Sequence, residues 1–249
     1  DQKSQADAEW TGEKYNSKFE GSWIPSEYRN QPTPKNFAID KRTLRWSEFK
    51  HMQAEEMLQH VQGKVFPFLK DLNGAESNFT HHMKNAVFII PKPALLVEAV
   101  KTIDEIFEVM DKDSQEKGQA FQDIQGDVYE MLLSEIATAG KNGQFRTPRH
   151  IIQLMVEMTA PTPTDTICDP ASGTCGFLVA AGEYLREQHP ELFNDASARS
   201  HFHYGMFHGY DFDNTMLRIG SMNMALHGVE NPDIRYKDSL AQDHAGDEE

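Results

Sequence analysis

The sequence predicts an α/β protein in which a mostly helical N-terminal domain precedes a domain built on a parallel sheet. Three observations support this prediction. The chain has 249 residues, enough for one or two domains that each bury a core. Apolar residues recur with a helical period between residues 46 and 140. After Pro161, strand-like and helix-like segments alternate.

Composition limits the classes of protein to consider. Hydrophobic residues make up 39% and charged residues 25% of the chain, as in ordinary soluble domains. The net charge of −15 argues against a free-standing, sequence-independent nucleic-acid binder, although a partner subunit could supply basic contacts. Two cysteines exclude a disulfide scaffold. No apolar run suits a membrane span and the first residues resemble no signal peptide, so we expect a cytoplasmic protein.

Residues 1–45 are expected to form an irregular N-terminal arm. The segment is polar and carries several prolines, with no clear period. Disordered tails are poor in aromatic residues, but here three tryptophans fall within the first 46 residues. We therefore expect the arm to be anchored by aromatic side chains, namely Trp10, Trp23 and Trp46.

Residues 46–140 are expected to form the helical N-terminal domain. One helix has apolar residues at three- and four-residue steps: Leu96, Val100, Ile103, Phe107 and Met110. A second helix is predicted over 123–139, with Gly140 as its stop and with Val128, Leu132 and Ile136 on one face. The one strand candidate before residue 160 is Ala86–Ile90.

Residues 141–249 are expected to form the sheet domain. Strands are predicted over 164–169, 205–210 and 234–236, and helices over 177–188 and 215–227. Residues 189–203 are treated as an insertion between the first helix and the second strand. The resulting β-α-β-α-β order implies a parallel sheet with right-handed crossovers.

The strongest chemical signal is the turn Asp169-Pro-Ala-Ser-Gly-Thr-Cys-Gly176, between a predicted strand and a predicted helix. Ligands of parallel α/β sheets bind at the carboxyl ends of the strands, where this turn lies. Small residues allow a ligand to approach the backbone, and the helix start exposes N–H groups. The alternative is a tight structural turn in which Asp169 is a local cap.

Two further acidic residues follow the next two strands. Asp211 follows the second strand, where carboxylates typically hold ribose hydroxyls, and Asp238 follows the third. Asp211 alone is more simply a solvated loop aspartate, but chance explains three strands that each end in aspartate poorly. Upstream, Thr147 and Pro148 are predicted to be the N-cap and first residue of another helix, whose N-terminus can receive a ligand carboxylate.

Four segments together resemble a known family. Asp127–Leu133, Gly143–Pro148, Asp169–Leu178 and Asn223–Val229 strongly resemble the modification subunit of type I restriction–modification systems, in the family's order. These subunits are N6-adenine DNA methyltransferases that use S-adenosylmethionine. The resemblance covers about residues 85–240. It implies a Rossmann-like methyltransferase domain after the helical one, and it implies a separate specificity subunit and a restriction subunit as partners.

The resemblance also implies roles for individual residues. Asp211 matches the acidic position that holds the cofactor ribose, and Asp238 matches the acidic residue near the adenine amino group. The glycine-rich cofactor loop comprises Asp169, Ser172, Gly173, Thr174 and Gly176. The segment that meets the methionine end comprises Gln144, Phe145, Arg146, Thr147, Pro148 and Arg149. Cys175 departs from the family, which often has glycine there, so a positive φ would be costlier.

The family's catalytic motif, Asn/Asp-Pro-Pro-Phe/Tyr, is missing from this sequence. Asn231-Pro232-Asp233 lacks the second proline and the aromatic residue. We therefore assign no catalytic residue, and we expect the chain to hold the cofactor half of the domain, either as a fragment or with the remainder omitted. In the family, the target adenine is flipped out of DNA and methylated by direct displacement.

Other interpretations remain open at this point. A nucleotide-dependent enzyme of the same fold is disfavoured because the turn lacks a full G-x-G-x-x-G. A non-catalytic cofactor-binding or assembly module is the interpretation that the absence of the catalytic motif favours when taken by itself. The clustered His201, His203 and His208 have no closed set of ligand partners, so we predict no metal site.

Overall fold

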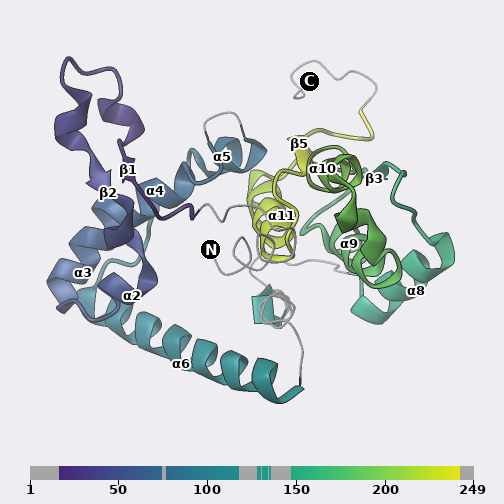
Figure 1. Ribbon diagram of the computed structural model, residues 1–249, viewed down its shortest axis with the longest axis horizontal. Helices are drawn as coiled ribbons and strands as arrows, with labels where there is room; N and C mark the ends of the chain where they lie inside the picture. Colours follow the sequence, from purple (N-terminus) through teal and green to yellow (C-terminus); the bar gives the residue numbers. More distant parts are fainter. Residues whose placement is uncertain are drawn as a thin grey trace. The chain divides into compact units, whose positions relative to one another are not determined.

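The computed structural model describes residues 17–74, 77–117, 128, 129, 131–133, 135 and 147–241 (Figure 1). The chain forms two compact units. Unit 1 comprises Asp1–Ala75 and Lys84–Glu116, and unit 2 comprises Glu76–Met83 and Lys117–Glu249. Residues 76–83 thus belong to a different unit from the residues on either side of them in the sequence.

Unit 1 begins with irregular structure and continues into helices. Strands β1 (Ser22–Trp23) and β2 (Ile39–Asp40) pair antiparallel. The 3-10 helices η1 (Ser26–Tyr28) and η2 (Pro34–Phe37) lie between the strands, and η3 (Lys41–Leu44) follows β2. The helices that follow are α2 (Trp46–Phe49), α3 (Ala54–His60), the π-helix η4 (Val61–Val65), α4 (Phe66–Lys70) and α6 (Pro93–Lys117).

Aromatic side chains hold the described part of the N-terminal arm in the unit 1 core. Trp23 is buried, and its ring lies edge-on to Phe68 at a centroid distance of 5.5 Å. Trp46 donates a hydrogen bond from Nε1 to Asp104 on α6 over 2.9 Å. Trp10 lies outside the described residues. Pro67, in the first turn of α4, follows the π turn η4 and has no N–H to donate to it.

Several expectations for the first 140 residues need correction. Ala86–Ile90 has no regular secondary structure and pairs with no described strand, while the two-residue strands β1 and β2 were not predicted because they have no period. On α6, Leu96 and Val100 are buried, but Ile103 is 40% exposed, so the predicted face is wrong there.

The predicted helix over 123–139 lies mostly outside the described residues. Its described positions between 128 and 135 are helical. Leu132 is exposed and Leu133 is buried, so the predicted apolar face is also wrong at Leu132. Ile136 and Gly140 lie outside the described residues.

Unit 2 contains a parallel sheet of the predicted kind. Its described strands are β3 (Ile167–Asp169), β4 (Phe207–Asp211) and β5 (Asp233–Tyr236), in the order β3-β4-β5. Asp169 is level with Gly209, and Asp211 is level with Tyr236. The carboxyl ends of the three strands therefore lie at one edge of the sheet.

Helices complete unit 2. They are α5 (Asn78–Met83), α8 (Arg149–Thr159), α9 (Gly176–Gln188), α10 (Ala196–Tyr204) and α11 (Asn214–Leu226), with the 3-10 helix η5 (Pro190–Asn194). Helix α8 packs against α9, and α11 packs against α5, β4 and β5 (Figure 1). Asp195 and Asp213 cap α10 and α11 by accepting the backbone N–H groups of Ala198 and Thr215, each over 2.7 Å.

The segment treated as an insertion is structured. Residues 189–203 form η5 and most of α10, and Phe202 of α10 is fully buried. Its ring lies edge-on to Phe207 of β4, with the centroids 5.2 Å apart. The insertion therefore belongs to the core that supports β4. Among the described helices of both units, none combines the length and apolar character needed to cross a membrane.

Candidate functional site

The turn from Asp169 to Gly176 connects β3 to α9 and is fixed to the neighbouring strand. The Ser172 N–H donates to the Tyr210 carbonyl over 2.9 Å, and the Cys175 N–H donates to the Ser172 carbonyl over 2.6 Å. Gly173 and Cys175 both have left-handed backbone, with φ of 50° and 62°. For Cys175 this conformation costs roughly 1–2 kcal/mol.

One side of the turn is closed and the other is open. A methyl group built on Gly220 of α11 would lie 2.6 Å from Cys175 Sγ and 3.0 Å from the Gly173 carbonyl oxygen. Helix α11 therefore touches the turn through its backbone. A methyl group built on Gly173 itself would meet no atom within 4 Å, so this glycine faces open space. The backbone at Gly173 is therefore accessible to a ligand.

Helix α11 also holds the turn through Asn223. The Asn223 side chain is fully buried, and its Nδ2 donates to the Thr174 carbonyl over 2.9 Å. Neither Gly220 nor Asn223 was predicted to contact the turn. Asn223 begins one of the four family-like segments, and that segment was the available signal.

Asp211, at the end of β4, is joined directly to the turn. Its Oδ2 accepts the Gly173 N–H over 3.0 Å, and its Oδ1 accepts the Asp213 N–H over 2.8 Å. The side chain is half-buried. A carboxylate oxygen has more than one acceptor site, so Asp211 can support the loop and still accept hydrogen bonds from a ligand.

Asp169 lies beside this carboxylate. Burial raises the pKa of Asp169 and the charge of Asp211 raises it further, against the lowering effect of the hydrogen bond from the Ala171 N–H. That hydrogen bond spans 3.0 Å to Oδ1, so Asp169 is also the local cap that the alternative interpretation predicted. Two acidic groups thus face the same edge, an arrangement suited to hydroxyl or amine donors.

The loop after β5 closes on the same turn. Ser239 donates its hydroxyl to the Pro170 carbonyl over 2.6 Å, and the Lys237 N–H donates to the Asp211 carbonyl over 3.0 Å. Asp238 is exposed, and its Oδ1 accepts the Leu240 N–H over 3.0 Å. The structure therefore places all three predicted aspartates on adjoining segments of one sheet edge.

The upstream segment is described only in part, because Gln144, Phe145 and Arg146 lie outside the described residues. Helix α8 begins at Arg149, with Pro148 in the N-cap position and no side-chain cap. The expectation that Thr147 is the N-cap was therefore wrong by one residue. The Pro148 carbonyl accepts the N–H groups of Ile151 and Ile152, so it begins the helix without a capping side chain.

Arg149 points toward helix α9. Its Nη2 lies 3.6 Å from Glu183 Oε2. A methyl group built on Gly176 would lie 3.3 Å from Ile152 Cδ1, so the start of α8 lies beside the end of the turn. The structure thus brings α8 close to the turn while its first arginine forms an ion pair with α9.

The three clustered histidines do not share one site. His201 Nε2 is 2.8 Å from the Asp165 carbonyl oxygen, whereas His208 Nδ1 is 2.9 Å from Asp233 Oδ2 and His203 is buried. Within the described part of the chain, no group of three or more His, Cys, Asp or Glu residues could hold a metal ion. Cys168 and Cys175 are both free thiols.

Two family models match the sequence. The model described as N-6 DNA Methylase matches residues 120–249, which is more than half of the chain. The model described as HsdM N-terminal domain matches residues 1–103.

Similar curated proteins are methylase subunits. The chain is 30% identical over 190 residues to the type I restriction enzyme StySPI methylase subunit of Salmonella potsdam, covering 75% of this chain and 34% of that protein. It is 28% identical over 200 residues to the EcoEI methylase subunit of Escherichia coli, covering 75% of this chain and 37% of that protein. The matched part is thus little more than a third of each relative.

Solved structures show the same fold. A modification subunit of a proposed type I restriction enzyme from Vibrio vulnificus YJ016 superposes with a TM-score of 0.66 at 22% identity, covering 96% of this chain and 47% of that one. A chain from a study of type I R-M system assembly superposes with a TM-score of 0.57 at 26% identity, covering 80% of this chain and 39% of that one.

Proposed function

Because the chain belongs to the N-6 DNA methylase family, we propose that it binds S-adenosylmethionine and serves in the N6-adenine methylation of DNA. We assign it to the modification subunit of a type I restriction–modification system, the class to which its curated relatives belong.

The observation that supports this proposal most directly is the hydrogen bond between Asp211 and the open turn. Asp211 Oδ2 holds the Gly173 N–H over 3.0 Å, and Gly173 faces open space on its other side. A ligand that lies over Gly173 would meet backbone on one side and the Asp211 carboxylate beside it. This combination suits an adenosine, which needs close backbone approach and an acceptor for its ribose hydroxyls.

In this proposal each part of the sheet edge binds a different part of the cofactor. Asp211 accepts the ribose hydroxyls, and Asp238 accepts the adenine amino group. The turn supplies backbone contacts through Asp169, Ser172, Gly173, Thr174 and Gly176. The segment Gln144, Phe145, Arg146, Thr147, Pro148 and Arg149 meets the methionine end.

The chemistry supplied by the bound cofactor is a methyl group on a sulfonium, which is a good leaving group. The residues of this chain orient that group and set the charge around it. Orientation and electrostatic stabilisation can by themselves provide much of an enzyme's rate enhancement. The Asn/Asp-Pro-Pro-Phe/Tyr motif does not occur among the 249 residues, so we propose no catalytic residue here.

DNA and other subunits are the proposed partners. The net charge of −15 is unsuited to holding a DNA duplex unaided, because phosphate contacts require basic side chains. We therefore propose that a specificity subunit supplies most of the DNA contacts, and that a restriction subunit joins the same assembly.

Calorimetric titration of the full chain tests the cofactor assignment. We expect saturable binding of S-adenosylmethionine and no binding of NADH, because the turn lacks the complete dinucleotide pattern G-x-G-x-x-G. Binding of NADH in preference to S-adenosylmethionine, or of neither compound, would overturn the proposal.

A further inference from the structure

Helix α5 belongs to the sheet unit although it lies in the N-terminal part of the sequence. Its residues, Asn78–Met83, fall within the 1–103 match to the HsdM N-terminal domain. In the structure they pack against α11 and β5, and they belong to unit 2. The chain before and after this short helix belongs to unit 1.

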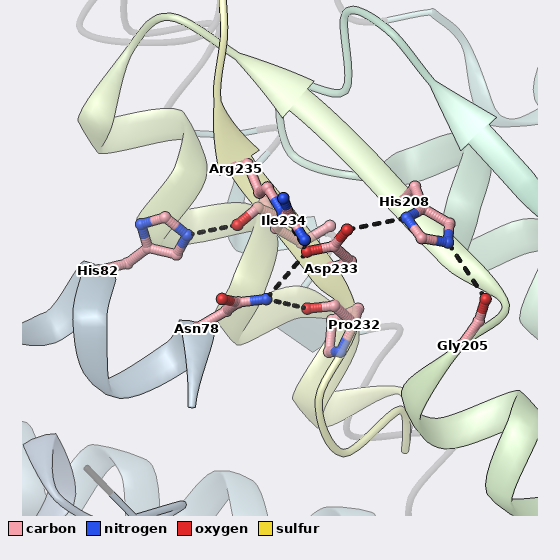
Figure 2. Close-up of polar contacts among 8 residues, drawn as sticks. All are labelled: Asn78, His82, Gly205, His208, Pro232, Asp233, Ile234 and Arg235. Carbon is pink, nitrogen blue, oxygen red and sulfur yellow. Dashed lines mark hydrogen bonds and ion pairs between the residues drawn. The ribbon is translucent and has the colours of Figure 1, made fainter. Parts of the chain in front are cut away.

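Two side chains of α5 bond to the start of β5 and to the residue before it (Figure 2). Asn78 Nδ2 donates to the Pro232 carbonyl over 3.2 Å and lies 3.3 Å from Asp233 Oδ1. His82 Nε2 is 2.7 Å from the Ile234 carbonyl oxygen. A carbonyl only accepts, so Nε2 carries the proton in this contact. His82 is buried, which makes loss of this hydrogen bond costly.

Side chains from β4 and β5 hold the same stretch from other directions. His208 Nδ1 lies 2.9 Å from Asp233 Oδ2, and Arg235 Nε donates to Asp233 Oδ1 over 2.6 Å. Burial alone would raise the pKa of Asp233, but hydrogen bonds from Arg235 and His208 outweigh it and lower that pKa. Residues 232–234 are therefore held at three consecutive positions.

Residues 232–234 are connected to the candidate site in two ways. The Ile234 side chain is fully buried over Gly209, where an added methyl group would lie 2.8 Å from Ile234 Cδ1 and 3.0 Å from Ser172 Cβ. Ile234 thus packs beside the turn. Strand β5 also continues into the loop in which Ser239 donates to the Pro170 carbonyl.

We propose that His82 and Asn78 are positioning residues for the cofactor site. They fix the backbone of β5, so that Ile234 supports the turn and the loop carrying Asp238 closes on Pro170. This inference rests on the proposed function, since it names residues that act on the same site.

Cofactor affinity and hydrogen exchange of the full chain test this proposal together. His82→Ala removes the donor to Ile234, and His82→Gln keeps a donor at a similar distance. Asn78→Ala removes the second contact, and His51→Ala, at an exposed histidine of unit 1, is the matched control. Calorimetry with S-adenosylmethionine gives the Kd and the stoichiometry, and exchange of amides 169–176 without ligand reports directly on the turn.

We expect His82→Ala to raise the Kd about three- to tenfold, the size expected for one lost buried hydrogen bond. Stoichiometry should stay unchanged and exchange at 169–176 should quicken, while His82→Gln restores most of the affinity and His51→Ala matches wild type. An unchanged Kd with a reduced stoichiometry would mean that His82 only supports folding, and would overturn the proposal.

The remaining outcomes are also decisive. If His82→Ala does not fold, Asn78→Ala decides, because a raised Kd supports the proposal and an unchanged Kd contradicts it. If the wild-type chain binds no S-adenosylmethionine, the proposed function fails. The positioning role is then judged from exchange alone, and unaltered exchange at 169–176 in both variants would refute it.

Discussion

Asp169 carries a charge that the fold disfavours. Its pKa is raised above the usual value of 3.8 by burial and by Asp211. The Asp169 carboxyl group therefore keeps its proton to a higher pH in the native state than in the unfolded chain. The free energy of unfolding consequently falls as pH rises from about 3.8 through the native pKa.

Replacing this carboxylate should stabilise the protein without cofactor. Asp169→Asn keeps an oxygen that can accept the Ala171 N–H but removes the buried charge. We expect a higher free energy of unfolding at pH 7 and no difference from wild type at a pH well below 3.8, as measured by urea denaturation. A loss of stability at pH 7 would contradict the assigned effect of the charge.

Asp211 is expected to contribute to binding. Asp211→Ala removes the acceptor of two backbone N–H groups and the proposed acceptor of the ribose hydroxyls. Affinity for S-adenosylmethionine should fall by about 1–3 kcal/mol, measured by calorimetry. Asp195→Ala is the control, because it removes a similar bond at the start of α10. It should cost about 0.5–2 kcal/mol of stability and leave affinity unchanged. Equal affinities for both variants would count against Asp211.

At the scale of elements, the contact between α11 and the turn can be tested with two helical glycines. At Gly182 in α9 an added methyl group would meet Phe207 Cζ at 3.6 Å, an ordinary contact, whereas at Gly220 in α11 it would meet Cys175 Sγ at 2.6 Å. Both substitutions to alanine gain about 1 kcal/mol in helix propensity.

Their stabilities should therefore change in opposite directions. Gly182→Ala should raise the free energy of unfolding by up to about 1 kcal/mol. Gly220→Ala should lower it by about 1–3 kcal/mol through overpacking and should weaken cofactor binding. Urea denaturation followed by circular dichroism provides the comparison. Stabilisation by both substitutions would show that the turn does not lie against α11.

The sheet and its helices were predictable because turn chemistry marks their ends. The predicted strand over 205–210 and helix over 215–227 agree with β4 and α11 to within two residues. Helix α10 was missed because few of its residues are apolar, although Asp195 was an available capping signal. Strands β1 and β2 are too short for any period to appear.

The sequence predicted only those parts of the candidate site that follow from the order of strands and turns along the chain. The ends of adjacent parallel strands meet at one edge, so Asp169, Asp211 and Asp238 could be grouped from their strands alone. His82 lies 152 positions from its partner Ile234, in a helix too short for a helical pattern to stand out. Such a contact is set by tertiary packing, which no local pattern encodes.

At the scale of the whole molecule, charge opposes folding. The chain has 39 acidic and 24 basic residues, a net charge of −15 at pH 7. Mutual repulsion of like charges destabilises a compact state and is screened by salt. We expect the thermal midpoint to rise as salt increases from about 10 mM to about 150 mM, where the Debye length falls to ~8 Å. A midpoint that falls with added salt would show that attractive ion pairs dominate instead.

The central claim is that the carboxyl ends of β3, β4 and β5 form one adenosine-binding edge. A crystal structure of the chain grown with S-adenosylmethionine tests it most directly. We expect the adenosyl group over Gly173, with its ribose hydroxyls donating to Asp211. An adenosyl group bound away from this edge, with the Gly173–Asp211 turn unoccupied, would contradict it.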